Sequence, residues 1–187
     1  LVCLVHPDVA HVLHGDAGRL RQILTNLVGN AIKFTHQGEI VIRAESVEEN
    51  ETHAKIHFSV QDTGIGIPRE RLAAVFDRFT QADGSTTRKY GGTGLGLTIS
   101  KQLVEAMKGA IGVKSESGVG SDFWFDITFE IISSEPPVEI QPLPIAPDLR
   151  AVRILGVDDN QTNRKVLRHQ LAARGAETEE ASDAANA

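Results

Sequence analysis

The amino-acid sequence predicts an α+β protein whose first part is a two-layer α/β sandwich. Three runs of alternating apolar and polar residues, rich in β-branched and aromatic side chains, predict strands at 39–46, 54–62 and 122–131. Apolar residues at helical spacing and helix-starting residues predict helices at 16–35, 69–76 and 95–107. Strands joined mostly by hairpins, with helices on one side, form a sandwich of this class.

The longest predicted helix begins at Asp16, a favourable N-cap, and runs to about Thr35. One face of this helix is apolar and holds Leu20, Leu24, Leu27, Val28 and Ala31. The opposite face is polar and holds Arg19, Gln22, Asn26, Asn30 and Lys33.

Composition divides the chain of 187 residues into three parts. Residues 1–132 mix helical and strand patterns and form the main expected domain. Residues 133–150 hold five of the seven prolines, so we expect an extended, semi-rigid linker there. Residues 151–187 begin with the strand-like VRILGV and continue into a helical pattern.

Net charge and cysteine usage narrow the class of protein. A formal charge of −6 argues against a nucleic-acid binder, because neutralising phosphates requires clustered Lys and Arg. The single cysteine, Cys3, cannot form an internal disulfide, which favours a reducing, cytoplasmic compartment. We expect its side chain to be a small buried hydrophobe.

No apolar run approaches the roughly 20 residues of a membrane helix, so no membrane contact is expected. Because the chain starts with Leu rather than Met, we expect a piece of a longer parent, whose inner-membrane anchor, if any, lies elsewhere.

The first chemical motif is NLVGNAIKF, residues 26–34. Asn26, Asn30 and Lys33 are spaced i, i+4 and i+7, so they lie within roughly 60° of one another around the helix. An amide oxygen can coordinate Mg²⁺, and a lysine ammonium pairs with phosphate oxygens. A solvated helix face is the alternative interpretation, although a second Asn in mid-helix fits it poorly because Asn is a weak helix former.

The second motif is QDTGIGIP, residues 61–68. A strand ends at Asp62, and Gly64 and Gly66 then make a tight turn before Pro68 starts a helix. The glycines would let the backbone approach a flat ligand, and a carboxylate that accepts from an exocyclic amine reads adenine rather than guanine. An ordinary turn would explain the glycines equally well.

Two further motifs predict a lid and a phosphate site. FDRFTQAD, residues 76–83, places Phe76 and Phe79 beside a polar stretch typical of a mobile loop, although the rings alone would be ordinary core residues. GGTGLGLTIS, residues 91–100, sets four glycines before a helix, so backbone N–H groups at a positive helix end suit a triphosphate. This pattern matches neither the P-loop nor the dinucleotide fingerprint.

Together and in this order, the motifs resemble the nucleotide-binding domain of bacterial-type sensor histidine kinases, within the GHKL family shared with gyrase, heat-shock-90 and mismatch-repair ATPases. The resemblance spans roughly residues 10–130 and implies a mixed sheet backed by three helices, with ATP between the helices and a lid. It implies that Asn30 contacts Mg²⁺ through ATP, that Asn26 and Lys33 help with the phosphates and that Asp62 binds the adenine amino group. Independently of the resemblance, SGVGSDFWF places Ser121 before an apolar strand, where its hydroxyl could share a water or a bond with Asp62, although a turn alone explains the glycines. The full expected ATP-binding set is Asn26, Asn30, Lys33, Asp62, Gly64, Gly66, Ile67, Gly92, Thr93, Gly94, Leu95, Gly96, Leu97 and Ser121.

Asn26 stands where the ATPase branches of the family usually place a Glu that activates water. An amide cannot accept that proton, so the resemblance favours a protein histidine kinase of a two-component phosphorelay. Such kinases carry the acceptor histidine on a separate dimerisation domain, in a motif resembling HExRTP. None of the seven histidines has that context, so no catalytic residue is expected in this chain. The expected partner is a histidine-bearing domain of a homodimeric parent.

Residues 151–187 resemble the first strand and helix of a response-regulator receiver domain, which marks a hybrid kinase. Asp158 and Asp159 would lie at the end of the strand, where such folds bind Mg²⁺, although a plain strand-to-helix turn also explains them. Gly156 departs from the bulky residue usual in that strand, and the phosphoaccepting Asp is missing. We expect this fragment to be incomplete and either partly disordered or packed opportunistically.

Three functions remain to be separated by experiment. The first is a kinase domain that binds Mg-ATP and, alone, transfers nothing. The second is a nucleotide-binding regulatory module without kinase activity, favoured if no phosphohistidine forms when a histidine domain is added. The third is a GHKL-type ATPase, which steady ATP hydrolysis would indicate.

Overall fold

A computed structural model describes residues 1–10, 12–77, 95–132, 149–150, 152–172 and 175–183. The chain forms two compact units, one that holds elements β1 to β6 and one that holds β7, α4 and β8. The predicted linker falls almost wholly outside the described residues, so its conformation stays a prediction. Among the helices described, none is long and apolar enough to cross a membrane.

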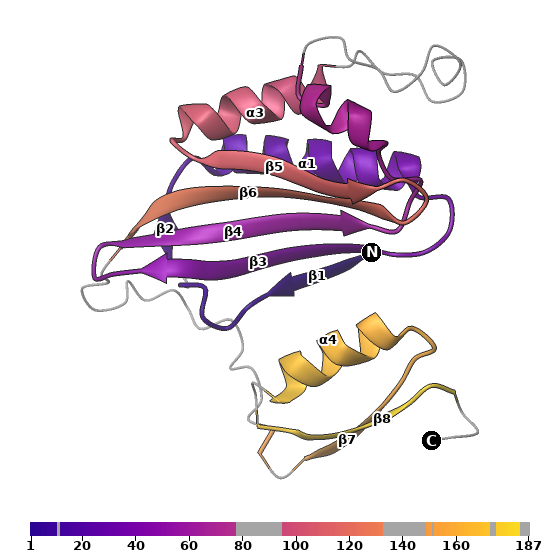
Figure 1. Cartoon of the computed structure of the whole chain (residues 1–187). Helices are drawn as coiled ribbons and strands as arrows, with labels where there is room; N and C mark the ends of the chain where they lie inside the picture. The colour runs from indigo at the N-terminus through magenta and orange to yellow at the C-terminus, as the bar shows by residue number, and fades with distance from the viewer. Residues whose placement is uncertain (11, 78–94, 133–148, 151, 173–174, 184–187) are drawn as a thin grey trace. The chain divides into compact units, whose positions relative to one another are not determined.

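The first unit contains one curved sheet (Figure 1). Its strand order is β1-β3-β4-β6-β2, and β5 also pairs with β6. The strands span Val2–Val5 (β1), Leu13–His14 (β2), Ile40–Glu49 (β3), His53–Asp62 (β4), Ala110–Glu116 (β5) and Gly120–Ile131 (β6). The β3/β4, β4/β6, β5/β6 and β2/β6 pairs are antiparallel, whereas β1 runs in the same direction as β3 in Figure 1. The sheet is therefore mixed, as the resemblance implied.

Helices cover one face of this sheet. Figure 1 shows α1 (Ala17–Phe34) and α3 (Gly96–Ala106) side by side above the strands. The segment after Pro68 forms a 3₁₀ helix, η1, over Arg69–Ala74, so it is tighter and shorter than the helix predicted at 69–76. The core lies between the two layers and includes Ile23, Leu27, Ala31, Ile56, Val60, Val104, Phe125 and Ile127.

The predicted start and end of the long helix are confirmed. Asp16 is its N-cap, and its Oδ1 accepts a hydrogen bond from the backbone N–H of Arg19 at 2.9 Å. At the other end Thr35 leaves the helical conformation while its N–H still donates to the Ala31 carbonyl at 3.0 Å. These two caps set where α1 begins and ends.

Strands β1, β2 and β5 were not predicted, and one expectation about the first of them is wrong. Cys3 is exposed rather than buried. Alternation along β1 turns Val2 into the protein and Cys3 out of it, because successive side chains of a strand point to opposite faces.

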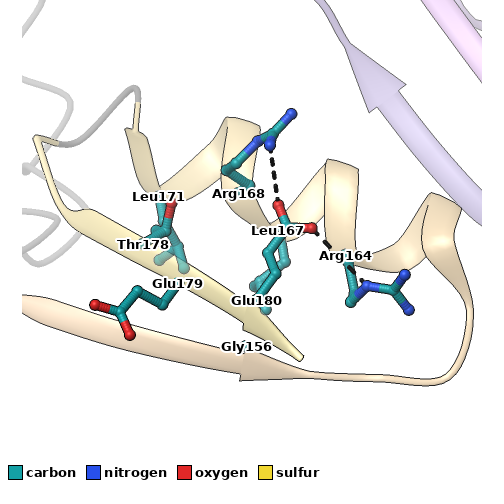
Figure 2. A pocket seen from close by; sticks show the side chains of 8 residues that line it. All are labelled: Gly156, Arg164, Leu167, Arg168, Leu171, Thr178, Glu179 and Glu180. Atoms are coloured by element: carbon teal, nitrogen blue, oxygen red, sulfur yellow. Dashed lines mark ion pairs between the residues drawn. The ribbon is translucent and has the colours of Figure 1, made fainter. Parts of the chain in front are cut away.

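The second unit is a parallel β-α-β element. Strand β7 (Arg153–Val157) pairs with β8 (Glu177–Ala181), and α4 (Gln161–Ala172) connects them. Leu167 and Leu171 of α4 lie over β8, where Arg164 and Arg168 reach the Glu180 carboxylate at 3.8 and 3.3 Å (Figure 2). In the described part of this unit α4 packs on the parallel pair, and the expectation of a partly disordered or opportunistically packed fragment stays a prediction.

Gly156 has a packing role in this unit. A Cβ at this position would come within 3.1 Å of Leu167 Cδ2. The glycine thus lets α4 lie close to β7, and this accounts for the absence of the bulky residue expected in that strand.

Candidate functional site

The polar face of α1 meets the beginning of α3. Asn26 Nδ2 donates a hydrogen bond to Ser100 Oγ at 2.8 Å, and Ser100 is buried. A Cβ on Gly96 would overlap Asn26 Oδ1, so only glycine allows this approach without displacing the amide. The Asn26 side chain therefore bridges the two helices.

The N-terminus of α3 carries no side-chain cap. Leu95 occupies the N-cap position without a side-chain hydrogen bond, and the first helical bond runs from the Ile99 N–H to the Leu95 carbonyl at 2.9 Å. The backbone N–H groups of the first turn thus have no intrahelical acceptor and form the positive end of the helix. Gly92, Thr93 and Gly94, the other predicted phosphate-binding residues of this segment, lie outside the described residues.

A hydrogen bond joins the chain on either side of the predicted lid. Thr98 Oγ1 donates to the carbonyl of Phe76 at 3.0 Å, and the Phe76 ring packs edge-on against Phe123 with centroids 6.3 Å apart. Phe76 thus packs into the core, as the alternative interpretation of this motif held. Phe79 and the predicted lid itself lie outside the described residues.

Asn30 and Lys33 continue the polar face of α1 beyond Asn26. The Asn30 side chain is half-buried and finds no hydrogen-bond partner among the residues that the structure describes. The Lys33 ammonium lies 4.9 Å from the centre of the Phe34 ring. The amide of Asn30 is therefore available to an external ligand.

Asp62 lies at the end of β4 with 6% of its surface exposed. Its Oδ1 accepts the backbone N–H of Gly64 at 2.8 Å. Burial raises the pKa of the Asp62 carboxyl, and the hydrogen bond from Gly64 opposes that shift. A hydrogen bond from the Ser121 backbone N–H also opposes the shift, so backbone groups of the protein orient this buried carboxylate.

The glycines after Asp62 pack against the protein's own backbone. A Cβ on Gly64 would overlap the carbonyl oxygen of Phe34 at the end of α1. Gly66 has a φ of +66°, and a Cβ there would overlap the carbonyl oxygen of Glu116. Contacts with α1 and β5 therefore fix this tight turn, and the approach of its glycines to a flat ligand stays a prediction.

A pair of serines supports this turn from the β5–β6 hairpin. Ser115 Oγ accepts the backbone N–H of Ile67 at 2.8 Å and donates to the carbonyl of Gly120 at 2.7 Å. The Ser121 hydroxyl lies 3.0 Å from Ser115 Oγ. The structure thus places Ser121 next to Asp62 in the β4–β6 register, with its hydroxyl bonded to Ser115.

The sequence did not predict a role for three hydroxyl-bearing residues of this region: Thr98, Ser100 and Ser115. Each acts on a segment distant in the sequence, so no local pattern marks it. The one available signal is for Ser115, which lies opposite Ser121 once the β5–β6 register is known.

The acidic pair of the second unit shapes a turn. Asp158 Oδ1 accepts the Asn160 N–H at 2.8 Å, and Arg164 donates to the Asp158 carbonyl at 2.6 Å. Asp159 is exposed. No group of three or more His, Cys, Asp or Glu side chains that could hold a metal exists among the described residues, so a Mg²⁺ site here stays a prediction.

Comparisons with known proteins match the first unit to one family. Residues 15–131 match the family described as histidine kinase-, DNA gyrase B- and HSP90-like ATPase. The sensor protein GacS of Pseudomonas syringae pv. syringae is 47% identical over 95% of this chain and 19% of its own length. The sensory/regulatory protein RpfC of Xanthomonas campestris pv. campestris is 40% identical over 91% of this chain and 27% of its own length. The chain thus spans about a fifth to a quarter of these relatives.

Solved structures give the same result. Full-length ShkA in complex with AMPPNP matches with a TM-score of 0.76 and 34% identity, over 98% of this chain and 35% of its own. The catalytic domain of histidine kinase ThkA matches with a TM-score of 0.54 and 30% identity, over 67% of this chain and 76% of its own. The predicted α+β fold of the first unit is confirmed.

Proposed function

Because the chain belongs to the histidine kinase-, DNA gyrase B- and HSP90-like ATPase family, and its ATPase domain is homologous to that of hybrid sensor histidine kinases, we propose that its first unit binds Mg-ATP and delivers the γ-phosphoryl group to a histidine of a partner domain. The relatives are named sensor proteins and sensor kinases, and ShkA was solved with AMPPNP. The chain covers only a part of each relative, so the activity of the whole parent belongs to this proposal.

The observation that carries the proposal is the junction of α1 with α3. The hydrogen bond from Asn26 to Ser100 places the polar face of α1 beside the uncapped N-terminus of α3. A helix end of this kind attracts phosphate through its free N–H groups and its dipole. The phosphates would therefore lie between the two helices, with the Lys33 ammonium one turn beyond Asn30.

The adenine end of the nucleotide would lie at Asp62. A buried carboxylate is an acceptor, so it selects a ring that presents an amino group and disfavours a ring that presents a carbonyl oxygen. The hydrogen bond from Gly64 fixes the orientation of this carboxylate before a ligand arrives. Such preorganisation lowers the entropy that binding must overcome.

Asn30 is the side chain that would hold Mg²⁺. Its amide oxygen is a hard neutral donor of the type that Mg²⁺ accepts alongside phosphate oxygens and water. The cation would neutralise charge on the phosphates, and the protein's part is to position it and the helix end. Asn26 is hydrogen-bonded to Ser100 and carries no basic group, so activation of water for ATP hydrolysis has no side chain to perform it at this position.

The reaction itself requires an acceptor outside the described site. A histidine nitrogen would attack the γ-phosphorus, the bond from that phosphorus to the bridging β–γ oxygen would break, and ADP would leave while the imidazole loses its proton. The structure gives His57 another role, because its Nδ1 lies 2.6 Å from Asp126 Oδ1 and its ring stacks on Trp124. The partner would be the histidine-bearing domain of a dimeric, cytoplasmic parent module.

The second unit is proposed to be the beginning of a receiver domain. Its parallel β7–α4–β8 order and the placement of Asp158 directly after β7 support this assignment. In the intact parent, this unit would receive the phosphoryl group from the histidine.

A phosphotransfer assay tests the proposal. The chain is mixed with a histidine-bearing dimerisation domain from a homologous kinase and with ATP labelled in the γ-phosphoryl group. We expect acid-labile label on the histidine domain, and none when its acceptor histidine is replaced by glutamine. ATP binding without any transfer would favour the regulatory module, and release of free phosphate at a steady rate would favour the ATPase.

A further inference from the structure

We propose that Ser100 is a positioning residue for the phosphate subsite and that it acts through Asn26. This inference rests on the proposed nucleotide site and adds to it a residue with no expected contact with the ligand. Ser100 is 1% exposed and lies on the side of α3 that faces α1. Its hydroxyl accepts the hydrogen bond that fixes the Asn26 amide.

The side chain of Asn26 touches α3 at two points one turn apart. Its Nδ2 reaches Ser100 Oγ at 2.8 Å, and its Oδ1 lies against Gly96, where a Cβ would overlap it. Gly96 and Ser100 are spaced i and i+4, so they lie on the same face of α3. The amide thus fixes both the distance between the helices and the position of the first turn of α3.

The same contact sets the position of the metal ligand relative to the helix end. Asn26 and Asn30 are also one turn apart, on the same face of α1. Loss of the Ser100 bond would free the Asn26 amide and let the first turn of α3 shift relative to Asn30. Subsites for phosphate and metal would then no longer align, because their N–H donors and amide oxygen belong to different helices.

The adenine end depends on other contacts. Asp62 is held by Gly64, and the turn that follows is held by Ser115, so these contacts come from β4, the turn after it and β5 rather than from α3. A change at Ser100 should therefore weaken the binding of phosphates and leave the binding of the nucleoside unchanged. A merely structural serine would affect both ligands alike.

Calorimetric titration of the whole chain with Mg-ATP and with adenosine tests this inference. Ser100→Ala should raise the dissociation constant for Mg-ATP about 5-fold, the effect of one hydrogen bond, while the constant for adenosine stays the same. Asn26→Ala combined with Ser100→Ala should bind Mg-ATP no more weakly than Asn26→Ala alone, because both changes break the same contact. Ser59→Ala serves as the matched control, since Ser59 is also buried but lies on β4.

The titrations can contradict the role of Ser100 in three ways. An unchanged Mg-ATP constant in Ser100→Ala, an equal loss for ATP and adenosine, or additive losses in the double variant would overturn the inference. If Ser100→Ala does not fold, Ser100→Cys keeps the volume and weakens the bond, and the same selective loss is required of it. Wild-type chain that binds adenosine but not Mg-ATP would refute the proposed function itself, whereas normal binding in wild type and variants refutes the role of Ser100 alone.

Discussion

The backbone N–H of Gly64 donates to Oδ1 of Asp62 at 2.8 Å, which ties the end of β4 to the turn that follows it. This bond orients a carboxylate that folding has removed from water. Burial of a charged carboxylate is unfavourable for stability. It is favourable for recognition, because a buried and oriented acceptor discriminates strongly between ligands.

The stability of the protein should depend on the ionisation of Asp62. Burial raises the pKa of this carboxyl above its ordinary value of 3.8. The folded state therefore binds this proton more tightly than the unfolded state, and the free energy of unfolding falls as the pH rises from 3.8 through the raised pKa. Asp62→Asn lacks this titration, so its free energy of unfolding should increase relative to wild type across the same range.

Urea unfolding of both proteins at a series of pH values from acid to neutral measures this difference. Titration of the other carboxylates cancels in the comparison. A constant difference between wild type and Asp62→Asn at every pH would show that the Asp62 charge is not penalised by burial.

Replacement of Asn30 by alanine should weaken Mg-ATP binding about 10-fold or more, equivalent to about 1.4 kcal/mol. The reason is the loss of the amide oxygen proposed as the metal ligand. Calorimetry in the presence and absence of Mg²⁺ checks this, because chelation of the metal should bring wild type close to the variant. Thr25→Ala, on the exposed side of α1, is the control. Equal dependence on Mg²⁺ in wild type and Asn30→Ala would remove Asn30 from the metal site.

Alanine substitutions at Gly66 and Gly118 distinguish the cost of backbone strain from the cost of steric overlap. Both have positive φ, +66° and +83°, but only Gly66 has an atom, the Glu116 carbonyl oxygen, in the place of a Cβ. Gly118→Ala should lower the free energy of unfolding by about 1 kcal/mol, the cost of a left-handed alanine. Gly66→Ala should lower it by about 3 kcal/mol or more, since β5 must also move. Equal losses in urea unfolding would mean that the turn and β5 do not pack as described.

The N-cap of α1 gives a test of the fold that is independent of any ligand. Asp16→Ala removes the acceptor for the Arg19 N–H and should lower the free energy of unfolding by about 1 kcal/mol. Asp16→Asn keeps an acceptor oxygen and should retain most of the stability. If both variants unfold alike, the helix does not begin at this cap.

The sequence was informative where the chemistry is local. Asp16 marks the start of α1, and the period of its apolar residues gives the face that packs on the sheet. Strand β5 was missed because AIGVKSE mixes Gly, Lys and Ser with only two strand-forming apolar residues, so its assignment depends on pairing with β6. Strand β7 was expected from VRILGV, but β8 was missed because ETEEA is mostly acidic and does not alternate apolar with polar residues.

In the candidate site, too, some residues are marked by local sequence and others are not. The motifs contain Asn26, Asn30, Lys33, Asp62 and the glycines at α3. The elements that carry them, α1, the end of β4 and the start of α3, lie in one unit. The roles of Ser100, the last residue of the motif at 91–100, and of Ser115 were not predicted, because their partners are the distant Asn26 and Ile67. Tertiary hydrogen bonds of this kind become visible only once the chain is folded.

Titration of the chain with Mg-ATP, with GTP as the competing purine nucleotide, tests the central claim most directly. The account predicts one ATP bound per chain, with a dissociation constant in the micromolar-to-millimolar range typical of enzyme substrates. GTP should bind at least about 10-fold more weakly, and Asp62→Asn should weaken ATP by a similar factor. A chain that binds no ATP, or that binds ATP equally well after Asp62→Asn, would contradict the account.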